Sequence, residues 1–553
     1  MKRSWWKESI VYQIYPRSFN DTSGNGLGDI NGIIEKLEYI KSLGVDIIWL
    51  SPIYDSPDND NGYDISDYKR ISEDFGGNKV FDELIEKIHS HGLKLIMDLV
   101  ANHSSDQHSW FKEAKKSKLN PFHDYYIWKD GKINEHPNNW ESVFGGSAWK
   151  WNKETEEFFL HLYTKNQPDL NWENPRVRKE IYSIIDFWLS KGVDGFRMDV
   201  ISLISKKLDF ENVPKEISFK DVMEKFYANG PRVHEFLKEM NREVLSKYDI
   251  VTVGEGPGIN LEKGLSYVDE NEKELNMVFH FDHLTIDFGP KGKYDPIPID
   301  FIRFKKIFSQ WDFLLADKGW NSIFLGNHDF SRIVSRFGND NKYRVESSKL
   351  LVTLLMTLRG TPYIYQGDEI GMTNICYPSI DYYDDVETIN AWKEAELNGE
   401  NMSEFLRSVH LQSRDNARSP MQWNSIKNSG FTNGKPWIPV NDNYKRINVS
   451  SQLKDSNSTL NYYKEIIALR KTNSTLIYGE YKDLKPDHPQ FFIYKRWDEN
   501  HNFLIIHNFS EKLLKWENVS IMDYNLIFSN YKIEKNQIEI RPWETRVYKL
   551  KNY

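Results

Sequence analysis

Short apolar runs alternate with longer amphipathic stretches along most of this 553-residue chain. Such runs are typical of buried strands, and apolar residues three and four positions apart indicate helices between them. The pattern predicts helices such as 33–42 and 80–91, and strands at residues 11–15, 45–50, 93–100, 193–200, 250–253, 277–281, 323–325 and 362–365. Repeated strand–helix alternation predicts a parallel α/β sheet, and eight units fit a closed (β/α)8 TIM barrel. A doubly wound open sheet is disfavoured, because no glycine-rich phosphate loop follows the first strand.

The fourth predicted strand holds a cation and an acid at its end. The helix before it is well delimited, since Asn174 can act as N-cap, Pro175 suits the first helical position and Gly192 lies just past the end. Arg197 and Asp199 are two residues apart in the strand, so their side chains point to the same face. An arginine beside a buried carboxylate keeps the acid ionised. The pair fits a positioned nucleophile, and a purely structural ion pair is the alternative.

Two stretches interrupt the strand–helix rhythm. Residues 104–172 follow the third strand and are rich in Trp, Asn and Lys, which predicts an inserted lid domain. Beyond residue 479 the pattern changes to period two, with predicted strands at 491–495, 503–507, 538–540 and 547–550. We therefore expect a catalytic barrel (1–103 and 173–479), a lid (104–172) and a C-terminal antiparallel β-sandwich (480–553).

Composition narrows the class of protein. A hydrophobic share of 39% and a mean hydropathy of −0.64 predict a soluble globular protein, and a net charge of −9 argues against a nucleic-acid partner. The most apolar run, 350–358, is far shorter than the roughly 20 residues that span a bilayer. With the single cysteine Cys376 and no apolar signal segment at the start, we expect a cytoplasmic protein without a membrane partner. The sequence leaves the oligomeric state open, and we expect a monomer.

Polar side chains recur where the predicted strands end. In a (β/α)8 barrel, the carboxyl ends of the strands form the face on which the chemistry takes place. Titratable and aromatic residues follow five of the strands: Asp60 and Tyr63, His103, Asp199, Glu255, and His328 with Asp329. The three carboxylates that follow the fourth, fifth and seventh strands indicate a catalytic site rather than loop decoration.

Two carboxylates with opposed protonation states are what glycoside hydrolysis requires. Asp199, held ionised by Arg197, could attack an anomeric carbon, and Glu255 would need a raised pKa to act as the acid. Like-charge repulsion from Asp329 can supply part of that rise. The two histidines could donate hydrogen bonds to sugar hydroxyls, and the Tyr63 ring could stack on a sugar face.

Eight motifs spread over nearly the whole chain support a family resemblance. They are WWKE at 5–8, YQIYPRSF at 12–19, DLVANH at 98–103, QPDLNW at 167–172, GFRMDV at 195–200, VGE at 253–255, NHD at 327–329 and RDNARSPMQW at 414–423. Together they resemble the α-amylase superfamily, glycoside hydrolase family thirteen, and within it the oligo-1,6-glucosidase and α-glucosidase group.

The resemblance implies a retaining mechanism with Asp199 as nucleophile, Glu255 as acid/base and Asp329 as transition-state stabiliser. It implies no cofactor for catalysis, and a pocket-like subsite that makes the enzyme exo-acting. The residues that it places around the terminal glucose are Asp60, Tyr63, His103, Arg197, His328 and Arg414, with Phe144 of the lid on the wall. We therefore expect an α-glucosidase that acts on short oligosaccharides such as isomaltose.

Two positions bear on the linkage that is cleaved. Val200, directly after the nucleophile, matches members of the group that favour α-1,6 links, whereas Thr there goes with α-1,4 preference. Gly256 stands where the α-1,6 enzymes usually carry Met, and its missing side chain is expected to widen the region where the leaving group departs. Phe330 and Ser331 also replace the usual Gln-Pro. We expect α-1,6 preference, and α-1,4 activity stays open.

Other activities of the same family are alternatives. Sucrose isomerases resemble the chain but carry an Arg-Leu-Asp-Arg-Asp loop, where this sequence has HLTID at 283–287 without arginines. Trehalose-6-phosphate hydrolases share nearly every motif, and no phosphate-binding cluster in the sequence excludes their activity. A non-enzymatic transporter-subunit relative is disfavoured, because such proteins need a membrane anchor and have typically lost the catalytic carboxylates.

The segment 21–29 resembles the short calcium loop of these glucosidases. Oxygen ligands for a structural Ca²⁺ would come from Asp21, Ser23, Asn25, the Leu27 carbonyl and Asp29. The family pattern has Asn and Asp where this chain has Ser23 and Asn25, so an ion would be bound weakly. A metal-free turn held by side-chain hydrogen bonds is the alternative.

Overall fold

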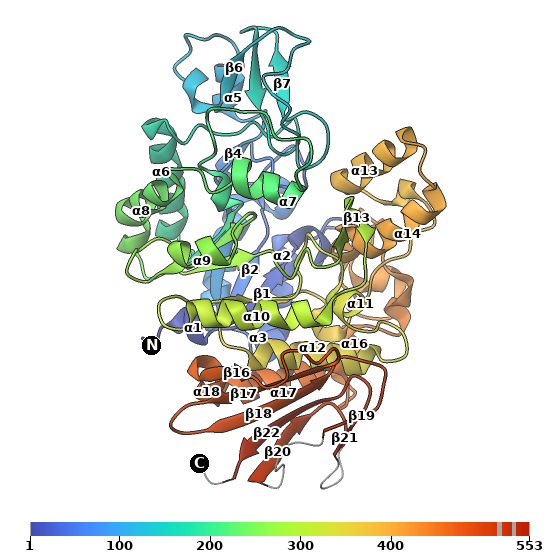
Figure 1. Cartoon of the computed structure of the whole chain (residues 1–553). Coiled ribbons are helices and arrows are strands. Elements are labelled where there is room, and N and C mark those ends of the chain that lie inside the picture. Colours follow the sequence, from blue (N-terminus) through green and yellow to red (C-terminus); the bar gives the residue numbers. More distant parts are fainter. Residues whose placement is uncertain (1, 517–522, 533–537, 552–553) are drawn as a thin grey trace.

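A computed structural model describes residues 2–516, 523–532 and 538–551 of the chain (Figure 1). Its centre is one parallel sheet of eight strands, in the order β11-β10-β9-β5-β2-β1-β15-β14. The strands are β1 (Val11–Ile14), β2 (Ile47–Leu50), β5 (Lys94–Val100), β9 (Gly195–Asp199), β10 (Val251–Gly256), β11 (Met277–His280), β14 (Ser322–Ile323) and β15 (Thr361–Tyr365). The Ser322 hydroxyl donates to the Val278 carbonyl at 2.5 Å, which joins the two outer strands. The sheet is therefore closed, and the predicted (β/α)8 barrel is confirmed.

Helices follow the strands and cover the outside of the barrel. They are α2 (Ile30–Glu35) with α3 (Leu37–Ser42), α4 (Gly77–Ser90), α6 (Pro175–Ser190), α8 (Val233–Glu243), α9 (Leu261–Val268), α10 (Phe301–Leu315), α12 (Arg344–Thr357) and α17 (Thr459–Lys471). The start of α6 is as predicted, because the Asn174 side chain accepts the N–H of Arg176 and Pro175 takes the first position. Gly192 lies past its end with a φ of +102°, a region that glycine adopts freely. The predicted single helix 33–42 is wrong, because the chain leaves helical geometry at Lys36.

Two excursions stand beside the barrel. Between β5 and α6 lie α5 (Ser109–Ala114) and a three-stranded antiparallel sheet of β6 (Trp128–Asp130), β8 (Glu157–Leu160) and β7 (Trp149–Asn152), at the top of Figure 1. Between β15 and α17 lie α13 (Val386–Leu397) and α14 (Met402–Gln412), on the right of the same view. The first excursion falls within the predicted lid, whereas the second was not predicted from the sequence.

The chain ends in antiparallel β-structure. Five strands form one sheet in the order β16 (Glu480–Asp483), β17 (Phe491–Trp497), β18 (Asn502–Asn508), β22 (Thr545–Leu550) and β20 (Tyr524–Ser529), and β19 (Leu514–Lys515) pairs with β21 (Glu539–Ile540). Phe492 and Tyr494 on one face join the main core, whereas Ile493 and Leu504 on the other pack with Ile540. The predicted C-terminal β-sandwich is confirmed, although β16, β19 and β20 were not predicted.

The apolar run at 350–358 is explained by the position of α12. This helix is buried from Ser347 to Thr357, because it packs against α17, β15 and the C-terminal strand β22. In the described part of the chain, no helix combines the length and the apolar character needed to cross a membrane. Two further hairpins, β3 (Tyr54–Asp55) with β4 (Asp67–Ile71) and β12 (Phe288–Gly289) with β13 (Gly292–Pro296), lie in the loops that follow β2 and β11.

Candidate active site

Strand β9 brings its acid to the carboxyl end of the sheet. Arg197 and Asp199 point to the same side, as predicted, with Arg197 Nη1 2.6 Å from Asp199 Oδ1. Val200 does not belong to the predicted strand 193–200, because its φ of +36° and ψ of +40° place it in the left-handed region. A β-branched residue rarely adopts that region, so the surrounding structure must hold the turn in place. The turn directs the Val200 N–H to Glu255 Oε2, which accepts it at 3.0 Å.

One guanidinium group holds three carboxylates together. Arg197, whose side chain is 1% exposed, contacts Asp98 at 2.8 Å, Asp199 at 2.6 Å and Glu255 at 2.5 Å. Since Nη1 touches Asp199 and Nη2 touches Glu255, these two acids are separated by at most two hydrogen bonds and the width of the guanidinium. Retaining glycosidases hold their carboxyls about 5–5.5 Å apart and inverting ones about 6.5–9.5 Å apart. The pair is therefore close enough to flank one glycosidic bond.

Burial governs the protonation of this cluster. The pKa of Glu255 is raised overall. Burial is the main cause and the Asp329 carboxylate adds to the rise, whereas Arg197 opposes it. Burial also raises the pKa of Asp199 well above its ordinary value, with Arg197 opposing the rise and Glu255 adding to it. Because several acids share one guanidinium, the cluster binds a proton more readily than isolated acids do. The expected rise at Glu255 is found, whereas Arg197 alone does not hold the pKa of Asp199 down.

The third acid, Asp329, is held in the ionised state. Burial alone would raise its pKa, but His328, Arg414 and Arg418 lower it below the ordinary value. Arg418 lies 2.9 Å from the carboxylate, His328 Nε2 3.1 Å and Arg414 3.4 Å. The Asp329 side chain is 24% exposed, compared with 8% for Asp199. An ionised acid on the open side of the cluster can accept hydrogen bonds from sugar hydroxyls.

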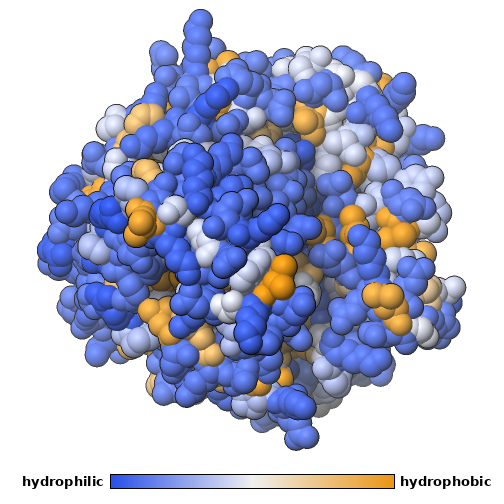
Figure 2. All heavy atoms as spheres, turned by 90° about the horizontal axis from the view of Figure 1, so that it is seen from above, coloured by the Kyte–Doolittle hydropathy of each residue, from blue (hydrophilic) through white to orange (hydrophobic). Residues whose placement is uncertain are grey.

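Arg414 connects the barrel to the lid. It contacts Asp60 at 3.2 Å and Asp385 at 2.7 Å, and its guanidinium lies 4.8 Å from the centre of the Phe144 ring. The Phe144 carbonyl accepts a hydrogen bond from Asn390 of α13 at 3.0 Å. Seen from the lid side, hydrophobic residues gather along one side of a shadowed hollow (Figure 2). The two excursions thus meet at Phe144, beside the predicted residues Asp60 and Arg414.

Both predicted histidines are buried and uncharged at neutral pH. Burial lowers the pKa of His103 to about 4 and that of His328 to about 3. Gln13 Nε2 lies 2.8 Å from His328 Nδ1, and because an amide nitrogen can only donate, the ring proton is on Nε2. The Tyr63 hydroxyl lies 2.6 Å from that Nε2, and the Tyr63 ring stacks on the imidazole at 5.4 Å. Tyr63 therefore positions His328, and one face of its ring is not available for the expected sugar stacking.

Gly256 does not widen the pocket as expected. A Cβ atom added at this buried position would come within 2.5 Å of Ile259 Cδ1 and 2.9 Å of Ile259 Cγ1. The Ile259 side chain is itself buried, at 3% exposure, and fills the space beside the glycine. The expected widening is wrong, because a residue three positions along the chain occupies the space of the missing side chain.

The loop predicted to hold calcium is closed by its own hydrogen bonds. Asp21 accepts the backbone N–H groups of Ser23, Gly24 and Gly26 and the hydroxyls of Ser23 and Thr432. Asp29 caps α2 by accepting the Gly32 N–H at 2.7 Å, and Asn25 Oδ1 accepts the Leu27 N–H at 2.8 Å. A carboxylate offers about four lone-pair sites, so Asp21 has none left for a cation. These side chains hold the loop as the alternative, a turn stabilised by hydrogen bonds, and calcium binding here stays a prediction of the resemblance.

Four residues of the cluster were absent from the predicted site. Each contacts a predicted residue: Asp98 touches Arg197, Gln167 donates to Asp60 and lies 3.1 Å from His103, Asp385 touches Arg414, and Arg418 touches Asp329. Asp98, Gln167 and Arg418 lie inside motifs that supported the resemblance, so closer inspection of those motifs could have found them. Asp385 lies in none, and only the folded chain brings it to Arg414.

Comparisons with known proteins agree with this geometry. The family model of the alpha-amylase catalytic domain matches residues 13–479. An oligo-1,6-glucosidase of Parageobacillus thermoglucosidasius is 53% identical over 560 residues, covering 100% of both chains, and a trehalose-6-phosphate hydrolase of Bacillus subtilis is 47% identical, covering 91% of this chain and 90% of the relative. The crystal structure of an isomaltulose synthase from Klebsiella sp. LX3 has a TM-score of 0.97 at 42% identity, covering 100% of each chain. The chain therefore belongs to the α-amylase family of glycoside hydrolases.

Proposed function

We propose that this enzyme is a retaining, exo-acting α-glucosidase that hydrolyses terminal α-1,6 bonds of short oligosaccharides such as isomaltose, with α-1,4 bonds as slower substrates. The observation that carries the proposal is the single guanidinium that contacts both Asp199 and Glu255. The 53% identity to an oligo-1,6-glucosidase supports the linkage, as does Val200 at the position after the nucleophile.

In the first step, Asp199 attacks the anomeric carbon of the terminal glucose. Glu255 donates its proton to the glycosidic oxygen, so the bond to the leaving sugar breaks as the bond to Asp199 forms. Burial and Asp329 raise the pKa of Glu255, which favours the protonated acid needed here. The product of this step is a covalent glucosyl-enzyme and a free alcohol on the shortened sugar.

In the second step, water releases the glucose. Glu255, now a carboxylate, accepts a proton from the water, whose oxygen attacks the anomeric carbon and displaces Asp199. Two displacements restore the original α configuration. The ionised Asp329 stabilises positive charge on the sugar ring, and the uncharged His328 donates through Nε2 to the Tyr63 hydroxyl, which holds the imidazole beside Asp329.

The walls of the site favour action at chain ends. Phe144 of the lid packs on Arg414 and is hydrogen-bonded to Asn390 of α13, so the two excursions meet beside the cluster. We take this contact as a wall of the sugar site, which an internal glucose unit, with chain on both sides, could not pass. The substrate therefore enters with its terminal glucose first.

A neutral sugar fits the charges better than a phosphorylated one. Arg197, Arg414 and Arg418 each contact at least one carboxylate of the cluster. None of these three arginines offers an unpaired charge to a phosphate group. We therefore rank trehalose-6-phosphate hydrolysis below α-glucosidase activity. Rates of hydrolysis of the two substrates distinguish these activities.

The decisive measurement is the hydrolysis of isomaltose, maltose, sucrose and trehalose-6-phosphate side by side, with proton NMR of the first anomer released. We expect isomaltose to give the highest kcat/KM and α-glucose to appear first. Asp199→Asn should lower kcat about 10³-fold or more with the fold intact, as for other nucleophile replacements. Near-normal turnover in Asp199→Asn, or β-glucose as first product, would refute the mechanism.

A further inference from the structure

A buried glutamine contacts the side of the His328 ring that faces away from Asp329. Gln13 lies in β1 and is 1% exposed, and its Nε2 is 2.8 Å from His328 Nδ1 and 3.3 Å from Ser51 Oγ. The other ring nitrogen, His328 Nε2, is 3.1 Å from Asp329 Oδ2. Gln13 and Asp329 thus contact different nitrogens of one imidazole.

The two contacts place different requirements on the ring protons. An ionised carboxylate can only accept a hydrogen bond, so Asp329 requires a proton on His328 Nε2. An amide nitrogen can only donate, so Gln13 requires an unprotonated Nδ1. A ring with a single proton, on Nε2, satisfies both contacts and carries no charge. A doubly protonated ring would direct an N–H group at the N–H group of Gln13.

The surroundings of the imidazole act on its charge in both directions. Burial lowers the pKa of His328 to about 3, the nearby guanidinium groups act in the same direction, and Asp329 opposes them. A carboxylate within hydrogen-bond distance by itself favours a charged imidazolium. The contact at Nδ1 therefore matters for the charge, because that nitrogen is the one that would take the second proton. The charged and titratable groups around the ring are Tyr15, Tyr63, Asp329, Arg197, Arg414 and Arg418.

We propose that Gln13 is a positioning residue, which keeps His328 uncharged by directing an amide N–H at Nδ1. With an uncharged ring, the cations in contact with the Asp329 carboxylate are Arg414 and Arg418. An imidazolium would be a third cation there, and it would weaken the stabilisation that Asp329 gives to positive charge on the sugar ring. The effect on rate rests on the proposed function, whereas the protonation of the ring does not.

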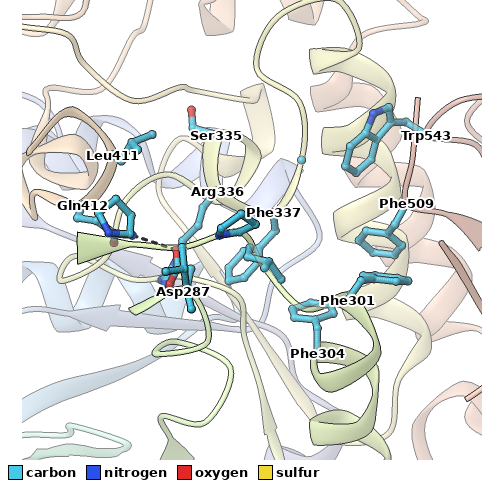
Figure 3. Close-up of a pocket in the computed structure, with 15 residues that line it drawn as sticks. Asp287, Phe301, Phe304, Ser335, Arg336, Phe337, Leu411, Gln412, Phe509 and Trp543 are labelled. Atoms are coloured by element: carbon cyan, nitrogen blue, oxygen red, sulfur yellow. Dashed lines mark hydrogen bonds and ion pairs between the residues drawn. The ribbon is translucent and has the colours of Figure 1, made fainter. Parts of the chain in front are cut away.

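Two replacements of Gln13 separate protonation from packing. Gln13→Glu places a carboxylate against Nδ1, so a ring between two carboxylates should be doubly protonated at neutral pH. Gln13→Met keeps a similar size without the donor, and burial should keep the ring uncharged. The matched control for a new buried acid is Gln412→Glu. Gln412 is 2% exposed and donates to Asp287 at 3.0 Å, beside a cavity of about 340 Å³ whose lining does not include His328 (Figure 3).

The measurement is proton–nitrogen NMR of the full chain, labelled with ¹⁵N in its histidine rings, from about pH 5 to about pH 8. The signals of His328 are those missing from His328→Asn. We expect a protonated Nε2 and an unprotonated Nδ1 in the wild type, in Gln13→Met and in Gln412→Glu. In Gln13→Glu we expect both nitrogens to be protonated at neutral pH, and a kcat for isomaltose at least about tenfold lower than in Gln13→Met.

The outcomes that contradict the proposal are distinct from those that contradict the proposed function. A proton on Nδ1 of the wild-type ring would overturn the role of Gln13, and the wild-type spectrum gives this answer even if Gln13→Glu does not fold. A singly protonated ring in Gln13→Glu, or equal kcat in Gln13→Glu and Gln13→Met, would also overturn it. If the wild type does not hydrolyse isomaltose, the proposed function fails, and the spectra still test the protonation of His328.

Discussion

At the scale of single residues, the site depends on a buried acid that does not face the substrate. Asp98 lies inside β5 and accepts hydrogen bonds from Trp49 Nε1 and the Tyr63 hydroxyl, both at 3.2 Å. Its other oxygen is 2.8 Å from Arg197. Asp98 therefore fixes the guanidinium that spans Asp199 and Glu255, and it acts as a positioning residue.

Asp98→Asn should lower kcat/KM for isomaltose by about 10- to 100-fold. General acid–base catalysis contributes about 10²–10⁴-fold, and this variant is expected to lose only a part of it. Its charge raises the pKa of Glu255, so a neutral side chain lowers that pKa. Because Glu255 acts first as an acid, it then loses its proton at lower pH, and the alkaline limb of the pH–kcat/KM profile should move to lower pH. Asp194→Asn, just before the opposite end of β9, is the control and should leave the limb in place. An unmoved limb in Asp98→Asn contradicts the role.

A second residue-scale prediction concerns Gly256 and its neighbour Ile259. Gly256→Met should destabilise the enzyme by about 1–3 kcal/mol, because the new side chain collides with Ile259 and overpacks the core. Adding Ile259→Ala should restore much of the melting temperature. Calorimetric scans of the three variants, with isomaltose/maltose rate ratios, provide the measurement. If Gly256→Met alone melts like the wild type, Ile259 does not fill that space.

At the scale of elements, the contact between the lid and α13 shapes the pocket. Asn390 of α13 donates to the Phe144 carbonyl at 3.0 Å, and Phe144 packs over Arg414. The two excursions are more than 200 residues apart in the chain, and Asn390 comes 246 residues after Phe144. The two excursions are thus joined at Phe144, beside Arg414.

Asn390→Ala should raise the KM for isomaltose about 2- to 10-fold, because a hydrogen bond of about 0.5–1.5 kcal/mol no longer holds the wall. The acids stay in place, so kcat should change little. Asn398→Ala, at the exposed end of the same helix, serves as control and should behave like the wild type. Steady-state kinetics on isomaltose measure the effect, and an unchanged KM in Asn390→Ala would show that the contact is not needed.

Elements with local signals were predictable from the sequence, and those without were not. The cap Asn174 and Pro175 defined α6, and the motifs located Asp199 and Glu255 at strand ends and Asp329 in the loop that follows β14. β16 alternates exposed with half-buried positions, so the apolar pattern was weak there. Long-range contacts left no local pattern, which is why Asp385 beside Arg414 and Ile259 over Gly256 were missed.

At the scale of the whole molecule, a buried arginine connects the C-terminal sheet to the barrel through hydrogen bonds. Arg496 in β17 donates to the carbonyls of Thr357 at 2.5 Å, Leu476 at 2.9 Å and Gly479 at 2.9 Å. Burial lowers its pKa to about 10, so the side chain stays charged at neutral pH. Thr357 is the last residue of α12, so its hydrogen bond with Arg496 links a helix of the barrel to the C-terminal sheet.

Arg496→Leu should lower the melting temperature by several degrees, because each buried carbonyl that loses its donor costs about 1–3 kcal/mol. The comparison variant is Lys482→Leu, an exposed position on the neighbouring strand β16, where little change is expected. Differential scanning calorimetry of both variants provides the measurement. Equal melting temperatures would show that the joint adds nothing to the stability of the assembled domains.

The two acids and the wall of the sugar site are carried by different elements, and this bears on how substrate specificity can change in evolution. Asp199 and Glu255 are mounted on β9 and β10, whereas the wall comes from the lid and from α13. Under the proposed mechanism, we expect mutations in the wall to change which sugar binds while Asp199 and Glu255 stay in place. We therefore expect new specificities to arise without any change to the two acids.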